Sequence, residues 1–458
     1  MSLTKTVGFF AGTTLAISGV AFGAEQNNDA LSQIAELKAE IASLRTAQQG
    51  DQWLTEQRAT EIRGIVTDVL ADSETRSSLQ GSGAGAGYNG GFFLASADGN
   101  YSMKINVLQQ MRWTFNDRTG ASENGLGNNN NWGFENKRSR LSFGGNMVDS
   151  TWTYKLSYYF AYSNDVEFNG ESPVLADAYV AKDLGDGLTL TVGQFKLPFS
   201  GEYGVDAGNL QFNDYSTISN MFTANYGEGV MIGYASDGFR INAAYVNAIS
   251  YLAAGSDIDN GFDENSPAAE YAFTARAEIK ASGTWEQFND AQSFKGDEFG
   301  VLVGIGANWE NANSTNGIGI DDAQVFGATA DVTMDFGGAS VMGAFFWDNV
   351  DAGNNNTGNP FGFTVQGGVF VSDDVEIVGR YEYGDLDTVG SGSDFSALTL
   401  GANWYVAKNQ AKLGVNFGYA FDGVSGAWAN AAEGNNLLQD ANGEDGQWLI
   451  QAQLSFSF

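Results

Sequence analysis

The C-terminal strand pattern is the feature that most constrains the fold of this chain. From Trp448 to Phe458, the even positions carry Trp, Ile, Ala, Leu, Phe and Phe, whereas the odd positions from 451 onward carry Gln, Gln, Ser and Ser. Because a β-strand sends alternate side chains to opposite faces, this strand is apolar on one face and polar on the other. An apolar outside, a polar inside and an aromatic tip are typical of a barrel in lipid.

The same period of two recurs along the chain from Phe92 onward. Short connections such as Ser236-Asp237-Gly238 alternate with long connections rich in Asn, Asp and Gly, which is the pattern of membrane barrels. We therefore predict an all-β membrane protein, a 16-stranded antiparallel transmembrane β-barrel over 92–458. One connection, 283–297, breaks the alternation because it is long where a short turn is due. The sixteen segments begin near residues 101, 134, 151, 174, 187, 226, 239, 267, 298, 323, 339, 361, 374, 394, 409 and 446.

Composition excludes several classes of function. The 458 residues include no Cys and no His, so disulfides, thiolate metal sites and every Ser-His triad are excluded, and we expect no enzyme. The net charge of −33 disfavours nucleic acid as a partner. Past the N-terminus, no apolar run reaches the roughly 18 residues of a membrane helix, so insertion would require a closed barrel. We expect no cofactor; the alternative is Ca²⁺ in the acidic loops, although none has EF-hand spacing.

The first residues have the pattern of an export signal. Lys5 precedes an apolar stretch from Val7 to Val20, and the small residues Ala21 and Gly23 suit a signal peptidase. We predict a signal peptide at 1–23, cleaved near Gly23, and therefore an exported bacterial-type protein. An uncleaved anchor is the alternative.

Two further segments precede the barrel. Residues 24–79 contain few Gly and many Ala, Glu, Gln and Leu, with heptad positions that are apolar at both ends and polar in the middle. This pattern predicts a periplasmic α-helical coiled coil; a single amphipathic helix on the barrel rim is the alternative. Residues 80–91, which contain Gly-Ser-Gly-Ala-Gly-Ala-Gly, predict a flexible linker.

Strand parity places most basic residues of the barrel on its inner face. If the apolar set of each strand faces lipid, the alternate residues face the lumen. The acids that parity places in the wall are fewer: Glu278, Asp331, Asp335, Glu376 and Glu382. The predicted pore-lining basic residues are Lys104, Arg112, Arg138, Arg140, Lys155, Arg240, Arg276, Lys280, Arg380 and Lys412.

The longest connection, 197–225, is the predicted constriction loop. It carries the acids Glu202, Asp206 and Asp214 and no basic residue. Folded inward, it would oppose the basic wall, and charges that line a pore filter its ions. In the alternative interpretation, wall charges pair with each other, for example Arg276 with Glu278 or Arg380 with Glu382.

Three stretches carry a family resemblance. Phe134 to Gly145, Leu175 to Val180 with Val192 to Ser200, and Gln366 to Glu382 resemble signatures of the phosphate-selective porin O and P family. The most specific run is Gly193-Gln194-Phe195-Lys196-Leu197-Pro198-Phe199. The end of the coil segment, Val69 to Arg76, is similar to porin-like proteins of planctomycete-type bacteria.

The resemblance implies a trimeric, sixteen-stranded outer-membrane channel whose third long loop folds into the lumen. It also implies an anion or phosphate preference through lumen Arg and Lys. Arg138, Arg140, Lys196 and Arg380 stand inside matching motifs, so Lys196 joins the predicted pore-lining basic residues. The family's phosphate channels depend on dense Arg and Lys in the constriction, whereas 197–225 has none. A general diffusion pore is therefore the prediction.

The expected function is an outer-membrane porin for passive diffusion of ions and small hydrophilic solutes, inorganic anions such as phosphate among them. Its expected partners are outer-membrane lipid, two further copies in a homotrimer, and peptidoglycan or cell wall through the coiled coil. Two alternatives from other classes are a structural or adhesive envelope barrel with a plugged lumen, which would not conduct ions, and a barrel enzyme, which would show turnover.

Overall fold

The computed structural model divides the chain into two compact units, Met1–Gly83 and Ala84–Phe458. The predicted signal peptide and coiled coil lie outside the described residues, except Lys38 and Ala39, which are helical. Among the residues described, no helix is long and apolar enough to cross a membrane. The structure describes residues 38–39, 84–162, 173–223, 226–247, 249, 269–312, 324–351, 357–387, 394–441 and 444–458.

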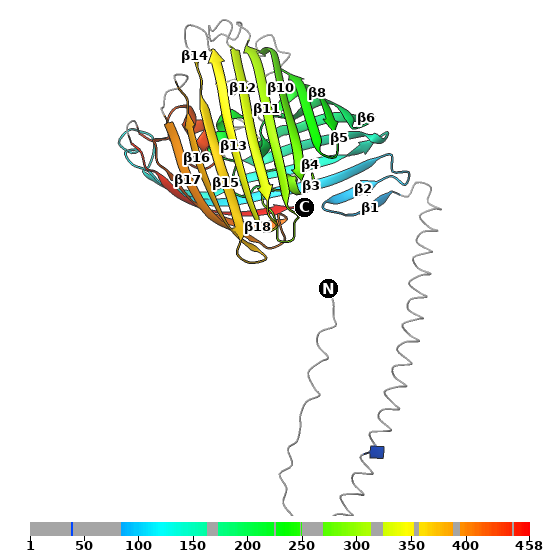
Figure 1. Ribbon diagram of the computed structural model, residues 1–458. Coiled ribbons are helices and arrows are strands. Elements are labelled where there is room, and N and C mark those ends of the chain that lie inside the picture. Colours follow the sequence, from blue (N-terminus) through cyan, green and yellow to red (C-terminus); the bar gives the residue numbers. More distant parts are fainter. Residues whose placement is uncertain are drawn as a thin grey trace, which may run out of the picture. The chain divides into compact units, whose positions relative to one another are not determined.

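Sixteen strands of the described part close into an antiparallel barrel (Figure 1), which confirms the predicted fold. Each strand pairs with the next along the chain, β13 pairs with β15, and β19 pairs with β3 to close the wall. The strands of the wall are β3 (Ser102–Asp117), β4 (Asn130–Met147), β5 (Asp149–Tyr162), β6 (Val174–Gly185), β7 (Leu188–Lys196), β8 (Tyr226–Ala235), β9 (Phe239–Val246), β10 (Ala269–Ser282), β11 (Gly300–Ala312), β12 (Gln324–Asp335), β13 (Ala339–Asp351), β15 (Phe361–Phe370), β16 (Val375–Asp385), β17 (Asp394–Tyr405), β18 (Ala411–Ala420) and β19 (Trp448–Ser457). A two-residue strand, β14 (Thr357–Gly358), pairs with the end of β13.

A hairpin precedes the barrel where the sequence predicts a flexible linker. Within 80–91, Gly85–Tyr88 forms β1, which pairs with β2 (Phe92–Ala95), and β2 pairs with the first residues of β3. Gly87 packs directly against the ring of Phe93, since an added Cβ at this position would lie only 2.9 Å from the ring. The Phe92 ring meets the C-terminal Phe458 ring edge-on, with centroids 5.8 Å apart, so the hairpin continues the sheet at the closing seam.

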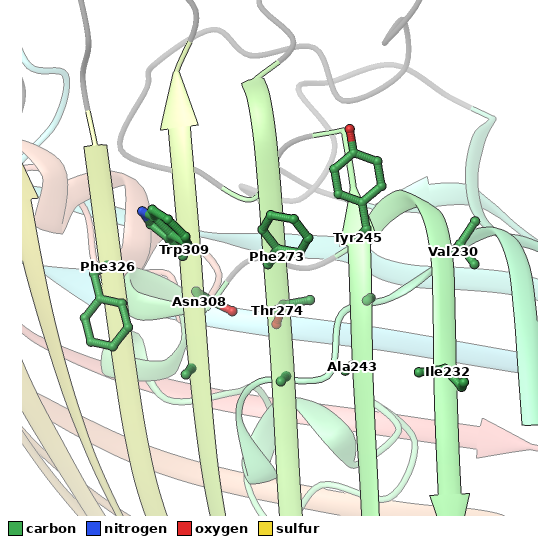
Figure 2. Close-up of a pocket in the computed structure, with 12 residues that line it drawn as sticks. Val230, Ile232, Ala243, Tyr245, Phe273, Thr274, Asn308, Trp309 and Phe326 are labelled. Carbon is green, nitrogen blue, oxygen red and sulfur yellow. The ribbon is translucent and has the colours of Figure 1, made fainter. Parts of the chain in front are cut away.

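The outer face carries the apolar set of each strand, as alternation predicts. Aromatic side chains of neighbouring strands lie level with one another: Tyr245 opposite Phe273, Phe273 opposite Trp309, and Trp309 opposite Phe326. Figure 2 shows this row above a strip of small residues, where the outer surface has a groove of about 450 Å³ lined almost wholly by apolar side chains. Such a surface suits contact with lipid.

Two long connections fold into the barrel and pack against each other. The first, 197–223, contains α2 (Gly201–Gly204) and α3 (Thr217–Phe222); the second, 422–441, contains α4 (Ala427–Glu433). Trp428 of α4 is fully buried, and its ring stacks on Phe395 of β17 and meets Phe222 edge-on. Apolar side chains from the inner faces of β13, β17 and β19 complete this core. Burial of such aromatic area is a large stabilising term, so both connections are part of the folded core.

A third inward connection enters from the opposite end of the barrel. We call this end the turn side, because the short turns such as 236–238 and 336–338 lie there. Residues 283–297, named here the turn-side strap, contain the 3₁₀ turn η2 (Gln287–Asn289) and bury Phe288, Gln292, Ser293 and Phe294. The long connection that breaks the sequence alternation is thus an inward-folded element.

Candidate permeation site inside the barrel

A cavity of about 550 Å³ lies inside the barrel between β4–β9 and the inserted connection 197–223. Its inner wall carries Arg140 of β4, Lys155 of β5, Lys196 of β7 and Arg240 of β9, together with threonines and aromatic rings. The two acids that line it are Asp177 of β6 and Asp206 of the inserted connection. The lining therefore contains four basic and two acidic side chains, which give it a net positive charge.

One side of the cavity is formed where the inserted connection faces the wall. Arg140 binds both carboxylate oxygens of Asp206, at 2.9 and 2.7 Å from Nη2. Lys196 lies near the same carboxylate, and its Nζ is 3.1 Å from the Tyr215 hydroxyl. Enclosure in the barrel disfavours the charge on Asp206, but the Arg140 guanidinium, the Gly208 backbone N–H and the Lys196 ammonium together outweigh that effect and hold the pKa of Asp206 well below its usual range. Two cations therefore surround one carboxylate at this point.

The other two basic residues of the cavity have carboxylates beside them. Lys155 Nζ lies 2.9 Å from Asp177 Oδ2, and Ser157 donates a second hydrogen bond to the same oxygen. Arg240 is paired with Glu278 of β10, and its guanidinium lies 4.5 Å from the ring centroid of Trp285 in the turn-side strap. The charges along this wall are thus largely compensated locally.

Asp214 lies outside the cavity, in a cage of three cations. Its carboxylate is 2.8 Å from Arg138 Nη2, 3.1 Å from Arg112 Nη2 and 3.2 Å from Lys137 Nζ, and all four side chains are buried. Burial disfavours the charge, but the cations outweigh it and hold the pKa of Asp214 far below its usual range. This cage fixes the inserted connection to β3 and β4.

Lys137 is a buried cation that the predicted inner-face set leaves out. The pairing of β3 with β4 shifts by one residue between Gln110 and Met111, so Lys137 is the extra residue of a bulge. A bulge re-aims side chains, and here it turns Lys137 and Arg138 toward the same carboxylate. The sequence carries a trace of this shift, because the outward apolar positions of β4 are even at Trp132 and Phe134 but odd at Leu141 and Phe143.

Glu202, the first predicted constriction acid, is also covered. It accepts hydrogen bonds from the Ser216 backbone N and from the hydroxyls of Ser216 and Ser219. These bonds join α2 to the start of α3 within the inserted connection. Its nearest cation is Arg380, at 3.9 Å. Of the three predicted constriction acids, Asp206 alone lines the cavity.

Five of the predicted pore-lining cations lie under the inserted connections instead of lining the cavity. They point inward as parity predicts, but backbone carbonyls and carboxylates of the inserted segments cover them. Arg380 donates to the Asp214 carbonyl, Arg276 binds Asp331 and the Phe199 carbonyl, and Lys412 donates to the Leu210 carbonyl. The five are Arg112, Arg138, Arg276, Arg380 and Lys412.

The last two predicted pore-lining cations lie near the turn side. Lys104 is exposed on the part of β3 that pairs with β2, and Lys280 is 3.4 Å from Asp237 in a turn. Wall charges also pair with each other, as the alternative interpretation proposed: Arg276 Nε lies 3.1 Å from Glu278 and Arg380 Nε lies 3.2 Å from Glu382. Wall pairs and loop pairs therefore coexist in this barrel.

Comparisons with known proteins agree with this geometry. The family model described as phosphate-selective porin O and P matches residues 105–425. No curated protein matches the chain significantly.

Solved porin structures resemble the barrel at low sequence identity. An anion-selective porin from Comamonas acidovorans has a TM-score of 0.53 and 12% identity, covering 78% of this chain and 99% of that one. OmpT of Vibrio cholerae has a TM-score of 0.50 and 14% identity, covering 78% and 98%. OmpF of Salmonella typhi in complex with daunomycin has a TM-score of 0.50 and 11% identity, covering 81% and 100%.

The family match spans well over half of the chain, and the sixteen-stranded barrel is the fold of these porins. The chain therefore belongs to the phosphate-selective porin O and P family and is an outer-membrane channel for ions and small solutes.

Proposed function

We propose that solutes cross the barrel through the cavity beside β4–β9, and that the channel is a general diffusion pore with a weak preference for anions. The observation that carries the proposal is the charge of the lining: Arg140, Lys155, Lys196 and Arg240 against two acids. Charges that line a narrow aqueous path set which ions enter it. The threonines of β5 and β7 add hydroxyl groups that can replace part of a solute's hydration shell.

Selective binding of phosphate is not part of this proposal. Arg140, Lys155 and Arg240 each have a carboxylate partner close by, which lowers the local field an anion would meet. The inserted connection 197–223 carries no basic residue of its own. A solute must bind weakly inside a channel if it is to leave again, and cations that are already paired with carboxylates provide such weak binding sites.

The test is the reversal potential of the purified protein in a planar bilayer under a KCl gradient. We expect a small anion preference that moves toward cations in Lys155→Met and Lys196→Met. Lys104→Met is the matched control, because that lysine is exposed on the extension of β3 and does not line the cavity. An unchanged reversal potential in both cavity variants would contradict the proposed path. Phosphate that blocks chloride current at low concentration would restore the phosphate-selective interpretation.

Assembly and export are further parts of the proposal. The resemblance to the family supports a homotrimer in outer-membrane lipid, which crosslinking of the purified protein tests. Export through a signal peptide at 1–23, and attachment to peptidoglycan through a coiled coil at 24–79, rest on the sequence patterns alone. Deletion of 24–79 should leave a folded barrel, and loss of heat-resistant trimers on a gel would assign the segment a role in assembly.

A second candidate function, a structural envelope barrel, is favoured by the apolar core inside the wall. Phe199, Phe222, Phe346 and Trp428 pack together in the half of the lumen beside β13–β19, where a wide pore would hold water. Conductance distinguishes the candidates, since a plugged barrel would carry no current in the same bilayer.

A further inference from the structure

The turn-side strap, 283–297, reaches the cavity by two separate routes. At one end, the Trp285 ring lies over the guanidinium of Arg240, 4.5 Å from Cζ to ring centroid, and its Nε1 donates to the Ser236 carbonyl. At the other, the Ala291 backbone N donates to the Asn209 carbonyl at 3.1 Å, and Asn209 Nδ2 donates to the Asn289 carbonyl at 3.2 Å. Asn209 belongs to the inserted connection.

Asn209 is bonded to the backbone of Asp206, whose side chain lines the cavity. Its backbone N donates to the Asp206 carbonyl at 2.8 Å, and the adjacent Gly208 N donates to Asp206 Oδ1 at 2.9 Å. Asp206 in turn holds Arg140. A continuous series of bonds therefore joins the strap to the Asp206–Arg140 ion pair in the cavity lining.

The strap is itself anchored on the wall, so it can act as a fixed support. Phe294 packs between Phe370 and Tyr405, with ring centroids 5.4 and 5.2 Å apart. Gln292 Nε2 donates to Asn409 Oδ1 at 2.8 Å, and Ser293 Oγ accepts from the Gly337 backbone N at 3.0 Å. These contacts come from turns and strands that do not touch the cavity.

We propose that the turn-side strap is a positioning segment of the pore: it holds Asp206 and Arg240 in place and so sets the cross-section and charge of the path. This inference rests on the proposed permeation path. A connection that merely joined β10 to β11 would need only a short turn, because Ser282 and Val301 are already paired. The extra length is used in contacts with the inserted connection and the wall.

The test compares single-channel conductance, open-channel noise and reversal potential of the full chain and its variants in the same bilayer. In Phe294→Ala, and in a chain whose residues 284–298 are replaced by Asp-Gly, we expect a conductance ratio to wild type above one, more flicker and a shifted reversal potential. Lys295→Ala is the matched control, because this exposed neighbour pairs only with an exposed Asp373 among the contacts described.

A reversible crosslink tests the route itself. The chain has no cysteine, so Asn209→Cys with Ala291→Cys introduces the only thiol pair, at two residues whose backbones are in direct contact. In the Phe294→Ala background, oxidation should return conductance and noise to wild-type values, and reduction should undo the return. A destabilised core without a positioning role would not be rescued in this way.

Each outcome decides between the two proposals. A conducting wild type whose folded strap variants match it in all three readouts would overturn the strap inference alone. A wild type that carries no current would overturn the proposed function, and the pore role of the strap with it. If the variants do not fold, the cysteine pair in the wild-type background remains: failure of that pair to oxidise would overturn the contact between strap and inserted connection.

Discussion

The carboxylate of Asp214 lies 2.8 Å from the guanidinium of Arg138, Oδ1 to Nη2, and both side chains are buried. Arg112 and Lys137 complete a cage that no solvent reaches. A buried charge is tolerated only with close partners, so this cage links the position of the inserted connection to the stability of the barrel.

Asp214→Asn should destabilise the barrel strongly, because it leaves three buried cations without their carboxylate. We expect a loss of about 3–5 kcal/mol in the free energy of unfolding, measured by urea titration in detergent. Asp373→Asn is the control; its carboxylate is 98% exposed, and loss of such a surface pair costs about 1 kcal/mol or less. Equal losses in the two variants would contradict the structural role of the cage.

The inserted acids should differ in their effect on selectivity. Asp206→Asn removes the carboxylate beside Arg140 and Lys196, so the reversal potential under a KCl gradient should move toward anions. Glu202→Gln should leave it unchanged, because Glu202 is buried against Ser216 and Ser219 and does not line the cavity. The same shift in both variants would contradict this expectation. It would show that a carboxylate affects selectivity through its electric field even when it does not line the permeation path.

The barrel could be predicted from the sequence because most of its wall follows a period of two. Alternation set the strand count, the inner face and the identity of the inward cations, as with Arg140 and Lys155. The contents of the lumen follow no such period. Residues 422–441 show no alternation, and their burial depends on contact between Trp428 and an apolar inner face that only the closed barrel assembles.

One sequence signal for the inserted connections does exist. Glycines stand at inward positions of the wall where the connections pass, and a Cβ on Gly384 would lie 2.4 Å from the Trp428 ring. From the sequence alone, a glycine that makes room for an inserted connection looks the same as one that relieves strain in the sheet. The change of parity in β4 signals a bulge, but which residue is the extra one depends on the partner strand.

Gly384→Val should therefore displace α4 from the inner wall. We expect a loss of about 1–3 kcal/mol in the free energy of unfolding, as for other overpacked cores. We also expect a higher single-channel conductance, because α4 would pack less tightly inside the barrel. Gly343→Val is the matched control, because the atom nearest to its Cβ, on Val365, lies 4.0 Å away on the outer face. Wild-type stability in Gly384→Val would mean that the inner core is loosely packed.

The turn-side strap should respond to pH through Asp290. Its carboxylate accepts a hydrogen bond from Asn409 Nδ2 at 3.0 Å. Burial raises the pKa of Asp290 to about 6, against the opposing effects of Asn409, Lys408 and Lys412 and with a small contribution from Asp297. Because this pKa lies above the value of about 4 for a free Asp, the docked strap gains stability from the protonated form. That stability is complete below about pH 4 and is lost as the pH rises through about 6.

We therefore expect lower conductance and less open-channel noise at about pH 4.5 than at about pH 7.5, with a midpoint near the pKa of Asp290. Asp290→Asn imitates the protonated carboxyl, so this variant should show the lower conductance and the lower open-channel noise at both pH values. Asp373→Asn, on an exposed turn, should keep the wild-type response. A pH response that survives in Asp290→Asn would assign the titration to another group and leave the docking of the strap independent of this carboxylate.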